Sequence, residues 1–126
     1  MEKLQNKSIL IVDDDDRNTF ALVSYLETLG VKITVAGNGR EALTMLEEGL
    51  ESDLILLDMM MPVMDGYETL DFMRQNSMLD RFPVIAVTAR AMKGDREKCL
   101  EAGASDYISK PVDMRLLIEK MNRWIH

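Results

Sequence analysis

The stretch LILLD, Leu54–Asp58, is the most informative part of this 126-residue sequence, because an apolar run ends directly in a carboxylate. A short, continuously apolar run is typical of a strand buried on both faces, as in a parallel sheet. The runs at 8–12 and 84–87 share this character. The run at 31–36 alternates instead, which suits an edge strand with one wet face, and a short fifth run lies at 107–108.

Segments with helical spacing alternate with these strands. The first is expected to begin at an N-cap, Asp16, and to end at Gly30. The other four are expected at 39–50, 66–76 and 91–102, and from Pro111 towards the C-terminus. The apolar stripes of the first and last helices are Phe20, Val23, Leu26 and Leu29, and Leu116, Leu117, Met121 and Trp124. Five strand–helix units predict an α/β fold with a parallel sheet and helices on both faces.

The composition excludes several classes of protein. The net charge is −7, from 22 acidic and 15 basic residues, which argues against direct nucleic acid binding by this domain. No apolar run approaches the roughly 20 residues that membrane insertion requires, and residues 1–5 hold no signal-peptide core. Cys99 is the only cysteine, so we expect a buried apolar side chain and a cytoplasmic location.

Polar residues follow four of the predicted strands. They are Asp13–Asp16 after the first, Asp58 after the third, Thr88-Ala89 after the fourth and Lys110-Pro111 after the fifth. In open parallel sheets, ligands bind outside the carboxyl ends of the strands, where the strand order reverses. Carboxylates, a hydroxyl and a lysine are therefore expected to converge on one edge of the sheet.

These residue types point to phosphoryl chemistry. Clustered carboxylates repel each other unless a cation neutralises them, and Asp13, Asp14 and Asp58 suit Mg²⁺, a hard ion that prefers oxygen ligands. A carboxylate beside Mg²⁺ and a lysine can act as a nucleophile and form an aspartyl phosphate. Lys110 would share the negative charge of the phosphoryl oxygens, and the Thr88 hydroxyl could donate a hydrogen bond to one of them.

Four motifs together resemble those of response-regulator receiver domains in two-component signalling. They are Ile11–Asp15, Leu56–Pro62, Thr88-Ala89 and Lys110-Pro111. The resemblance covers residues 7–125 and implies a single receiver domain over 1–126. It also implies a flavodoxin-like fold, with a five-stranded parallel sheet in the order 2-1-3-4-5.

The resemblance implies a metal site and a phosphoacceptor. Asp58 would be the phosphoacceptor. Asp14 would bind Mg²⁺ directly, Asp13 would bind it directly or through water, and the main-chain carbonyl of Met60 would be a further ligand. Mn²⁺ is a possible substitute. The domain would assist its own phosphorylation and dephosphorylation without being a multiple-turnover enzyme.

The resemblance also implies residues that stabilise the phosphoryl group and switch conformation. Lys110 would pair with Asp58, Thr88 and Ala89 would lie beside the phosphoryl group, and Tyr107 would be the switch aromatic. The surface of the fourth helix, fifth strand and fifth helix would then change its preferred partner. Loop geometry would depend on Pro62, Gly66 and Pro111, with the Lys110-Pro111 bond in the cis form.

Residues 91–107 are similar to receivers attached to hybrid sensor histidine kinases, which suggests a relay role or an excised domain. The partners would be a histidine kinase or histidine phosphotransfer protein, and a downstream effector or relay protein. His126 is the only histidine and is expected to be solvated, so no internal phosphohistidine donor is expected.

Other interpretations stay open from the residues alone. The Asp13-Asp14 pair could be a helix cap, Tyr107 could be a packing residue, and Met59–Met61 and Trp124 suit packing. A Mg²⁺-dependent phosphohydrolase would also form an aspartyl phosphate, although its nucleophile usually follows the first strand. A pseudo-receiver that only binds partners would bind no Mg²⁺.

Overall fold

The structure, a computed structural model, describes residues 4–61, 63–89 and 93–125. Strands and helices alternate within this part of the chain: β1 (Ser8–Val12), α1 (Asp16–Glu27), β2 (Lys32–Ala36), α2 (Gly39–Glu47), β3 (Leu54–Asp58), α3 (Gly66–Gln75), β4 (Val84–Thr88), α4 (Lys93–Ala102), β5 (Asp106–Ser109) and α5 (Met114–Trp124). The strands form one parallel sheet in the order β2-β1-β3-β4-β5, which confirms the predicted topology.

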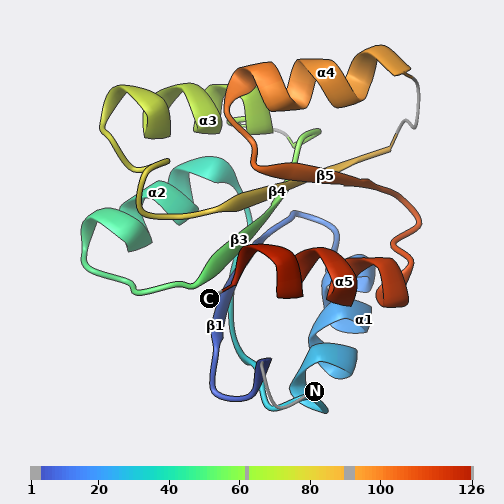
Figure 1. Cartoon of the computed structure of the whole chain (residues 1–126). Helices are drawn as coiled ribbons and strands as arrows, with labels where there is room; N and C mark the ends of the chain where they lie inside the picture. The colour runs from blue at the N-terminus through green and yellow to red at the C-terminus, as the bar shows by residue number, and fades with distance from the viewer. Residues whose placement is uncertain (1–3, 62, 90–92, 126) are drawn as a thin grey trace.

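The helices form two layers around this sheet (Figure 1). Helices α1 and α5 cover one face, and α2, α3 and α4 cover the other. The prediction of helices on both faces is therefore confirmed. The strand order reverses beside β1, because β2 pairs with one side of it and β3 with the other. At such a reversal, the carboxyl ends of β1 and β3 are where ligands bind in open α/β sheets.

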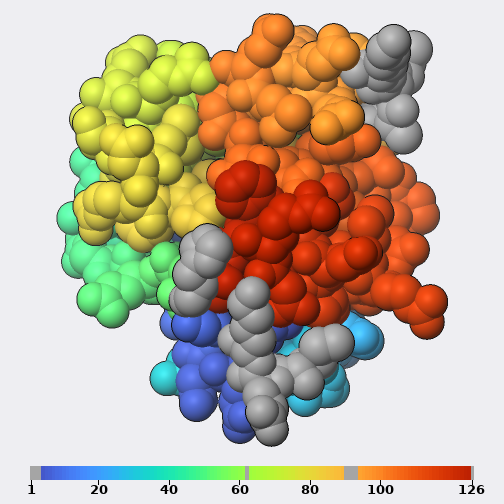
Figure 2. Space-filling view, viewed as in Figure 1, coloured from blue at the N-terminus to red at the C-terminus, as the bar shows by residue number. Residues whose placement is uncertain are grey.

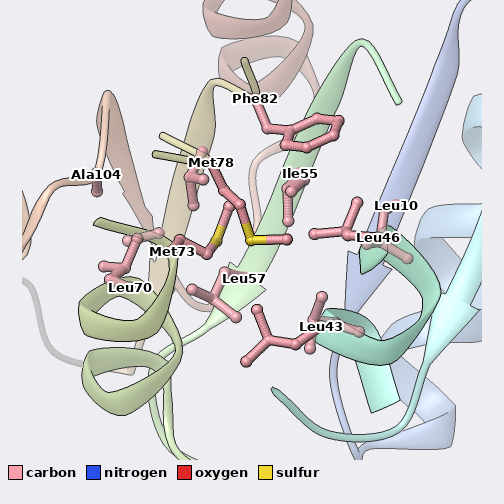
Figure 3. Packing of buried hydrophobic residues seen from close by; sticks show 14 of the residues in the cluster. Leu10, Leu43, Leu46, Ile55, Leu57, Leu70, Met73, Met78, Phe82 and Ala104 are labelled. Atoms are coloured by element: carbon pink, nitrogen blue, oxygen red, sulfur yellow. The ribbon is translucent and has the colours of Figure 1, made fainter. Parts of the chain in front are cut away.

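Strand β3 lies at the centre of both halves of the core, and all five of its residues are buried. Leu54 and Leu56 point into the cluster beneath α1 and α5, whereas Ile55 and Leu57 point into the cluster beneath α2, α3 and α4. Figure 3 shows side chains from both neighbouring helices closing around Ile55 and Leu57, namely Leu43, Leu46, Leu70 and Met73. Burial of apolar surface on both faces holds β3, and hence Asp58 at its end, in place.

The N-cap of the first helix lies one residue earlier than the sequence predicts. The prediction that Asp16 is the N-cap is wrong, because Asp15 has an extended backbone and its side chain accepts the backbone N–H groups of Arg17 and Asn18. Asp16 is instead the first helical residue. In a run of four aspartates each one could cap a helix, so only the backbone geometry decides between them.

The apolar stripes differ in detail from the predicted ones. In α1, Leu22 and Leu26 are buried, whereas Phe20 is 74% exposed, so its predicted place in the stripe is wrong. In α5, Leu117 is buried but Leu116 is 40% exposed. Adjacent helical positions are about 100° apart, and the buried stripe of α5 runs through Leu117, Ile118 and Met121, which leaves Leu116 outside it.

Most element bounds lie within a residue or two of those predicted. Strand β2 begins at Lys32, and β5 extends to Asp106 and Ser109 on either side of the predicted pair. Helix α3 ends at Gln75, with Asn76 as its C-cap. The predicted start of the fourth helix at Ala91 lies outside the described residues, as do Pro62, Arg90 and His126. None of the helices in the described part of the chain is long and apolar enough to cross a bilayer.

Candidate functional site

The carboxyl edge of the sheet brings the predicted site residues together. Asp13 directly follows β1, Asp58 is the last residue of β3, and Thr88 is the last residue of β4. Thr88 is paired in register with Ser109, so Lys110 follows β5 at the same edge. The backbone N–H of Lys110 also donates to the carbonyl of Thr88 at 2.7 Å. The sheet register alone therefore places four loops around one point.

Three carboxylates form a tight cluster at this edge. One oxygen each from Asp13, Asp14 and Asp58 lies within 4.8 Å of the others. Asp13 and Asp58 are buried, and Asp14 is exposed. Buried like charges at this separation are costly unless a cation neutralises them. The chemistry of this donor set, hard carboxylate oxygens with one side open to solvent, fits Mg²⁺.

Asp58 is held by two donors and is the most enclosed of the three. Its Oδ1 accepts the backbone N–H of Met60 at 3.0 Å, and its Oδ2 accepts from Lys110 Nζ at 3.3 Å. Burial raises the pKa of Asp58, and the neighbouring charge of Asp13 raises it further. The hydrogen bond from Met60 and the Lys110 ammonium lower the pKa but do not offset the burial. Burial therefore dominates, and the two donors compensate it only in part.

Asp13 is oriented by donors on both of its oxygens. Its Oδ1 accepts the backbone N–H of Asp15 at 2.8 Å, and its Oδ2 accepts from Asn18 Nδ2 at 2.6 Å. Lys110 Nζ lies 3.9 Å from the same Oδ2. Sequence reasoning missed Asn18, which lies five residues after Asp13 in the first turns of α1. An amide at a fixed offset from a strand-end aspartate is the only signal that could have indicated it.

A glycine, Gly66, allows the start of α3 to pack closely against the loop after β3. A Cβ on Gly66 would lie 2.5 Å from Met59 Sδ and 2.7 Å from Met59 Cα, so no other residue fits without displacing the loop. The backbone N–H of Gly66 donates to the Met59 carbonyl at 3.3 Å. Met59 and Met61 are buried, as expected for packing residues, whereas Met60 is 68% exposed. The close approach to Met59 leaves no room for a side chain at position 66, and the Lys110-Pro111 bond is cis as expected.

A cavity of about 440 Å³ adjoins the site on the α4 side. Its lining residues are Met59, Met60, Tyr67, Thr88, Ala89, Asp95 and Lys98. Behind it, the Tyr67 hydroxyl lies 3.8 Å from Cys99 Sγ. Burial raises the pKa of Tyr67 to about 12 and also raises the pKa of the Cys99 thiol. Cys99 is fully buried on α4, which confirms its prediction as a packing residue.

Tyr107 lies on β5 near two cationic side chains and is half-buried. Lys120 Nζ is 5.3 Å from the centre of its ring, and the Arg96 guanidinium carbon is 5.9 Å from it. Tyr107 also packs against the cluster beneath α2, α3 and α4. This position suits both the packing and the switch interpretation, so the switch role stays a prediction.

Asp106 is a third buried carboxylate, and it was not singled out from the sequence. It accepts hydrogen bonds from Lys120 Nζ at 2.8 Å, from Trp124 Nε1 at 3.1 Å and from the backbone N–H of Tyr107 at 2.8 Å. Arg123 Nη1 lies 3.7 Å away. Burial opposes ionisation of Asp106, but these donors outweigh it and hold its pKa below the usual value. Trp124 is therefore a packing residue that also donates a hydrogen bond.

A parallel sheet in this order, with an acidic pocket and a lysine at its carboxyl edge, defines a flavodoxin-like α/β protein. The sequence pattern of the response regulator receiver domain matches residues 9–122. The chain therefore belongs to the family of response regulator receiver domains, which are signalling modules of two-component systems. The resemblance inferred from the motifs is confirmed.

Two relatives illustrate the range of this family. The polar-differentiation response regulator DivK of Brucella anthropi is 37% identical over 119 residues, which cover 94% of this chain and 96% of that protein. Hybrid signal transduction histidine kinase I of Dictyostelium discoideum is 37% identical over 125 residues. That match covers 94% of this chain but only 7% of the kinase. A receiver of this kind thus occurs both in proteins of this length and within much longer kinases.

Solved structures share the fold closely. The receiver domain of the sensor histidine kinase PA1611 from Pseudomonas aeruginosa PAO1, with a magnesium ion coordinated in its active-site cleft, superposes with a TM-score of 0.84 at 37% identity, covering 94% of this chain and 97% of that one. The receiver domain of Ssk1, in complex with the histidine phosphotransfer protein Ypd1 of Saccharomyces cerevisiae, gives a TM-score of 0.85 at 31% identity. That match covers 96% of this chain and 90% of that one.

Proposed function

We propose that this chain is a phosphoacceptor in which Asp58 receives a phosphoryl group from the phosphohistidine of a histidine kinase or a histidine phosphotransfer protein. One observation carries the proposal. Asp58 Oδ2 lies 3.3 Å from Lys110 Nζ within a cluster that brings oxygens of Asp13, Asp14 and Asp58 within 4.8 Å of one another. Membership of the receiver family and the Ypd1 complex of the related Ssk1 receiver support the same class of partner.

Mg²⁺, or Mn²⁺ in its place, is the proposed cofactor. Asp13, Asp14 and Asp58 would hold the ion, with the main-chain carbonyl of Met60 as a further ligand. When bound, the ion would neutralise negative charge on the phosphoryl oxygens and on the carboxylates themselves. The magnesium ion in the related PA1611 receiver supports this assignment. The raised pKa of Asp58 also supports this assignment, because a bound cation would stabilise the ionised carboxylate that burial and Asp13 disfavour.

The reaction exchanges one bond to phosphorus for another. A carboxylate oxygen of Asp58 forms the new P–O bond while the P–N bond of the donor phosphohistidine breaks, and the electron pair of that bond stays on the imidazole nitrogen. The Met60 N–H and Lys110 Nζ hold the carboxylate in position for attack. Lys110 and the Thr88 hydroxyl then stabilise the phosphoryl oxygens, with Ala89 beside them. Hydrolysis later returns the free carboxylate.

The phosphoryl group would change the surface formed by α4, β5 and α5. We propose that Thr88 moves towards the phosphoryl oxygens and that Tyr107 turns into the space left behind. Figure 2 shows the face concerned, over which residues of α4, the β5 region and α5 form one continuous surface. A shift between two packings of this face would alter its affinity for a downstream effector or relay protein. We place this single domain, residues 1–126, in the cytoplasm, where such partners would meet it.

Intact-mass measurement tests the phosphoacceptor role. The purified chain is incubated with acetyl phosphate, with and without Mg²⁺, and the modified residue is mapped. We expect one added phosphoryl group on Asp58 that depends on Mg²⁺, and incorporation at background level in Asp58→Asn. Asp53→Asn is the matched control, because Asp53 precedes the same strand at the opposite edge and accepts the backbone N–H of Ser8 at 2.8 Å. Equal incorporation into Asp58→Asn and the parent would refute the assignment.

Two further results would replace this function with another. Repeated turnover of a small phosphate ester would indicate a Mg²⁺-dependent phosphohydrolase. Failure of the chain to bind Mg²⁺ at millimolar concentration would indicate a pseudo-receiver that acts only through partner binding. Both measurements use the same protein preparation as the mass experiment.

A further inference from the structure

We propose that Asn18 is a positioning residue of the metal site: its side-chain amide fixes the Asp13 carboxylate in the orientation that binds Mg²⁺. The inference rests on the proposed function, since it concerns the ion that this function requires. Asn18 would not contact the ion or the phosphoryl group. It would act through Asp13, and its effect would therefore be seen first in metal affinity.

The contact itself is short and unambiguous in its direction. Asn18 Nδ2 lies 2.6 Å from Asp13 Oδ2. An ionised carboxylate only accepts hydrogen bonds, so the amide must present its nitrogen to Asp13. Asp13 is 5% exposed and Asn18 is half-buried, which limits competition from water for this contact. A hydrogen bond to a charged group in such a place orients it strongly.

Two donors together prevent rotation of the Asp13 carboxylate. The backbone N–H of Asp15 donates to Oδ1 at 2.8 Å, and Asn18 donates to Oδ2. Turning the carboxylate about its Cβ–Cγ bond would break both bonds at once. Each oxygen has two lone pairs and uses one of them here, so a lone pair on each remains for a metal ion.

Asn18 is itself held in place by the capping of α1. The Asp15 side chain accepts the backbone N–H groups of Arg17 at 3.0 Å and of Asn18 at 3.4 Å. The first turn of α1 is thereby tied to the loop that carries Asp13. The chain of contacts from Asp15 to Asn18 to Asp13 is a supporting shell around a metal ligand, of the kind that sets metal affinity in other proteins.

The absence of charge on the Asn18 side chain matters as much as its hydrogen bond. Lys110 already places one cation 3.9 Å from Asp13 Oδ2 and 3.3 Å from Asp58 Oδ2. A second cationic side chain at position 18 would cancel the negative charge that attracts Mg²⁺. A carboxylate there would add a further repulsion to the cluster. A neutral amide donates a hydrogen bond and leaves the net charge of the site unchanged.

Calorimetric titration of Mg²⁺ into three variants tests the inference without any activity readout. Asn18→Leu keeps the size of the side chain and removes the donor. We expect it to weaken Mg²⁺ binding by about tenfold, the lower end for loss of a residue that supports a metal ligand. Asn18→His, measured at pH 8, places a neutral ring N–H near the position of the amide nitrogen and should recover most of the loss. Urea unfolding in EDTA checks that each variant is folded, and Asn18→Ala takes the place of Asn18→Leu if that variant is not.

Thr19→Val is the matched control on the same helix. Thr19 Oγ1 is buried and has no hydrogen-bond partner within the described residues, so this change should leave Mg²⁺ affinity unaltered. Equal Mg²⁺ affinity of the parent and of the folded variant that lacks the donor, Asn18→Leu or its replacement Asn18→Ala, would overturn the proposal. Equal weakening by Asn18→Leu and Asn18→His would also overturn it, because the donor would then be irrelevant.

A second readout separates positioning from a general defect. The rate of modification by acetyl phosphate is followed as a function of Mg²⁺ concentration. For Asn18→Leu we expect the midpoint to rise by the same factor as the dissociation constant, with the rate at saturating Mg²⁺ close to that of the parent. A lowered plateau with an unchanged midpoint would contradict the inference. If the parent binds Mg²⁺ but Asp58 is never modified, the proposed function fails, while the calorimetric comparison still decides the role of Asn18.

Discussion

Asp58 and Asp106 are both buried carboxylates beside a lysine, yet their surroundings have opposite effects. Asp58 is 2% exposed, its lysine nitrogen is 3.3 Å away, and burial raises its pKa. Asp106 is 9% exposed, its lysine nitrogen is 2.8 Å away, and three hydrogen bonds lower its pKa despite the burial. The first group is left short of positive charge, and the second is fully compensated.

This difference separates the proposed phosphoacceptor from a carboxylate with a structural role. Asp106 accepts hydrogen bonds from two side chains of α5 and from the backbone of Tyr107, and the side-chain contacts fasten α5 to β5. Asp58 lies beside Asp13, and the single ammonium group of Lys110 is within 4 Å of both carboxylates, at 3.3 Å from Asp58 and 3.9 Å from Asp13. A charge that the protein itself does not neutralise is suited to an external cation and a nucleophilic role. Burial alone does not distinguish Asp58 from Asp106, whereas the number of hydrogen-bond donors around each carboxylate does.

Removal of Asp106 should cause the largest loss of stability. Asp106→Ala leaves the Lys120 ammonium and the Trp124 N–H without their acceptor in a mostly enclosed place. We expect the free energy of unfolding to fall by about 3 kcal/mol, as for other buried pairs that lose one partner. Urea unfolding followed by circular dichroism measures this. A loss below that caused by changing the exposed Asp71 to Ala would show that the Asp106 contacts contribute nothing.

The loop that holds Asp58 should be the next most sensitive. Gly66→Ala forces a methyl group against Met59, with 2.7 Å to its Cα, and should cost about 2 kcal/mol. It should also slow phosphoryl incorporation, since Met59 follows Asp58 directly. Gly94→Ala is the matched control, because a Cβ there meets no atom within 4 Å and alanine favours the helix. If both variants unfold at the same urea concentration as the parent, the loop is not as tightly packed as proposed.

Neutralising Asp58 should have a smaller effect of opposite sign. In Mg²⁺-free buffer at pH 7, Asp58→Asn removes a charge that burial and Asp13 disfavour, and should stabilise the chain by less than Gly66→Ala destabilises it. Adding Mg²⁺ should raise the stability of the parent more than that of Asp58→Asn, by mass action. Urea unfolding with EDTA and with Mg²⁺ gives both values. Destabilisation by Asp58→Asn in EDTA would end the contrast with Asp106.

The pH dependence of stability should show the smallest effect and the clearest difference in sign. The folded protein holds the Asp58 proton more tightly than the unfolded chain does, so this group lowers stability as the pH rises from 3.8 towards its folded pKa. Asp106 does the reverse: its contribution is present above 3.8 and is lost as the pH falls below that value. Difference curves for Asp58→Asn and Asp106→Asn, without Mg²⁺, should therefore slope in opposite directions. Slopes of the same sign would contradict the assignment.

The parallel α/β class and the site edge follow from local patterns in the sequence, whereas the strand order came from the resemblance to receiver domains. Short, continuously apolar runs such as Leu54–Leu57 favoured strands buried on both faces, and the polar residues that end parallel strands share one edge of the sheet. Asp13, Asp58, Thr88 and Lys110 were all placed correctly by this argument. The cap of α1 was predicted one residue too late, at Asp16, and the structure places it at Asp15.

Other features depend on which way a helix turns. The exposure of Phe20 follows from the rotation of α1 on the sheet, and an apolar stripe in the sequence leaves that rotation uncertain by about one residue. The hydrogen bond from Asn18 to Asp13 depends on the same rotation. A spacing of five residues across a strand-end loop and a first helical turn has no fixed distance until the cap is known.

The sequence by itself determined the class of fold, the family and the set of residues at the carboxyl edge, because strand burial and strand-end position are local properties of the chain. Only the tertiary structure decided how charge is compensated at each carboxylate. Lys120 and Trp124 reach Asp106 from 14 and 18 residues away because α5 packs against β5, and Lys110 lies 52 residues from Asp58. Such distances depend on the packing of whole elements, which no local pattern encodes.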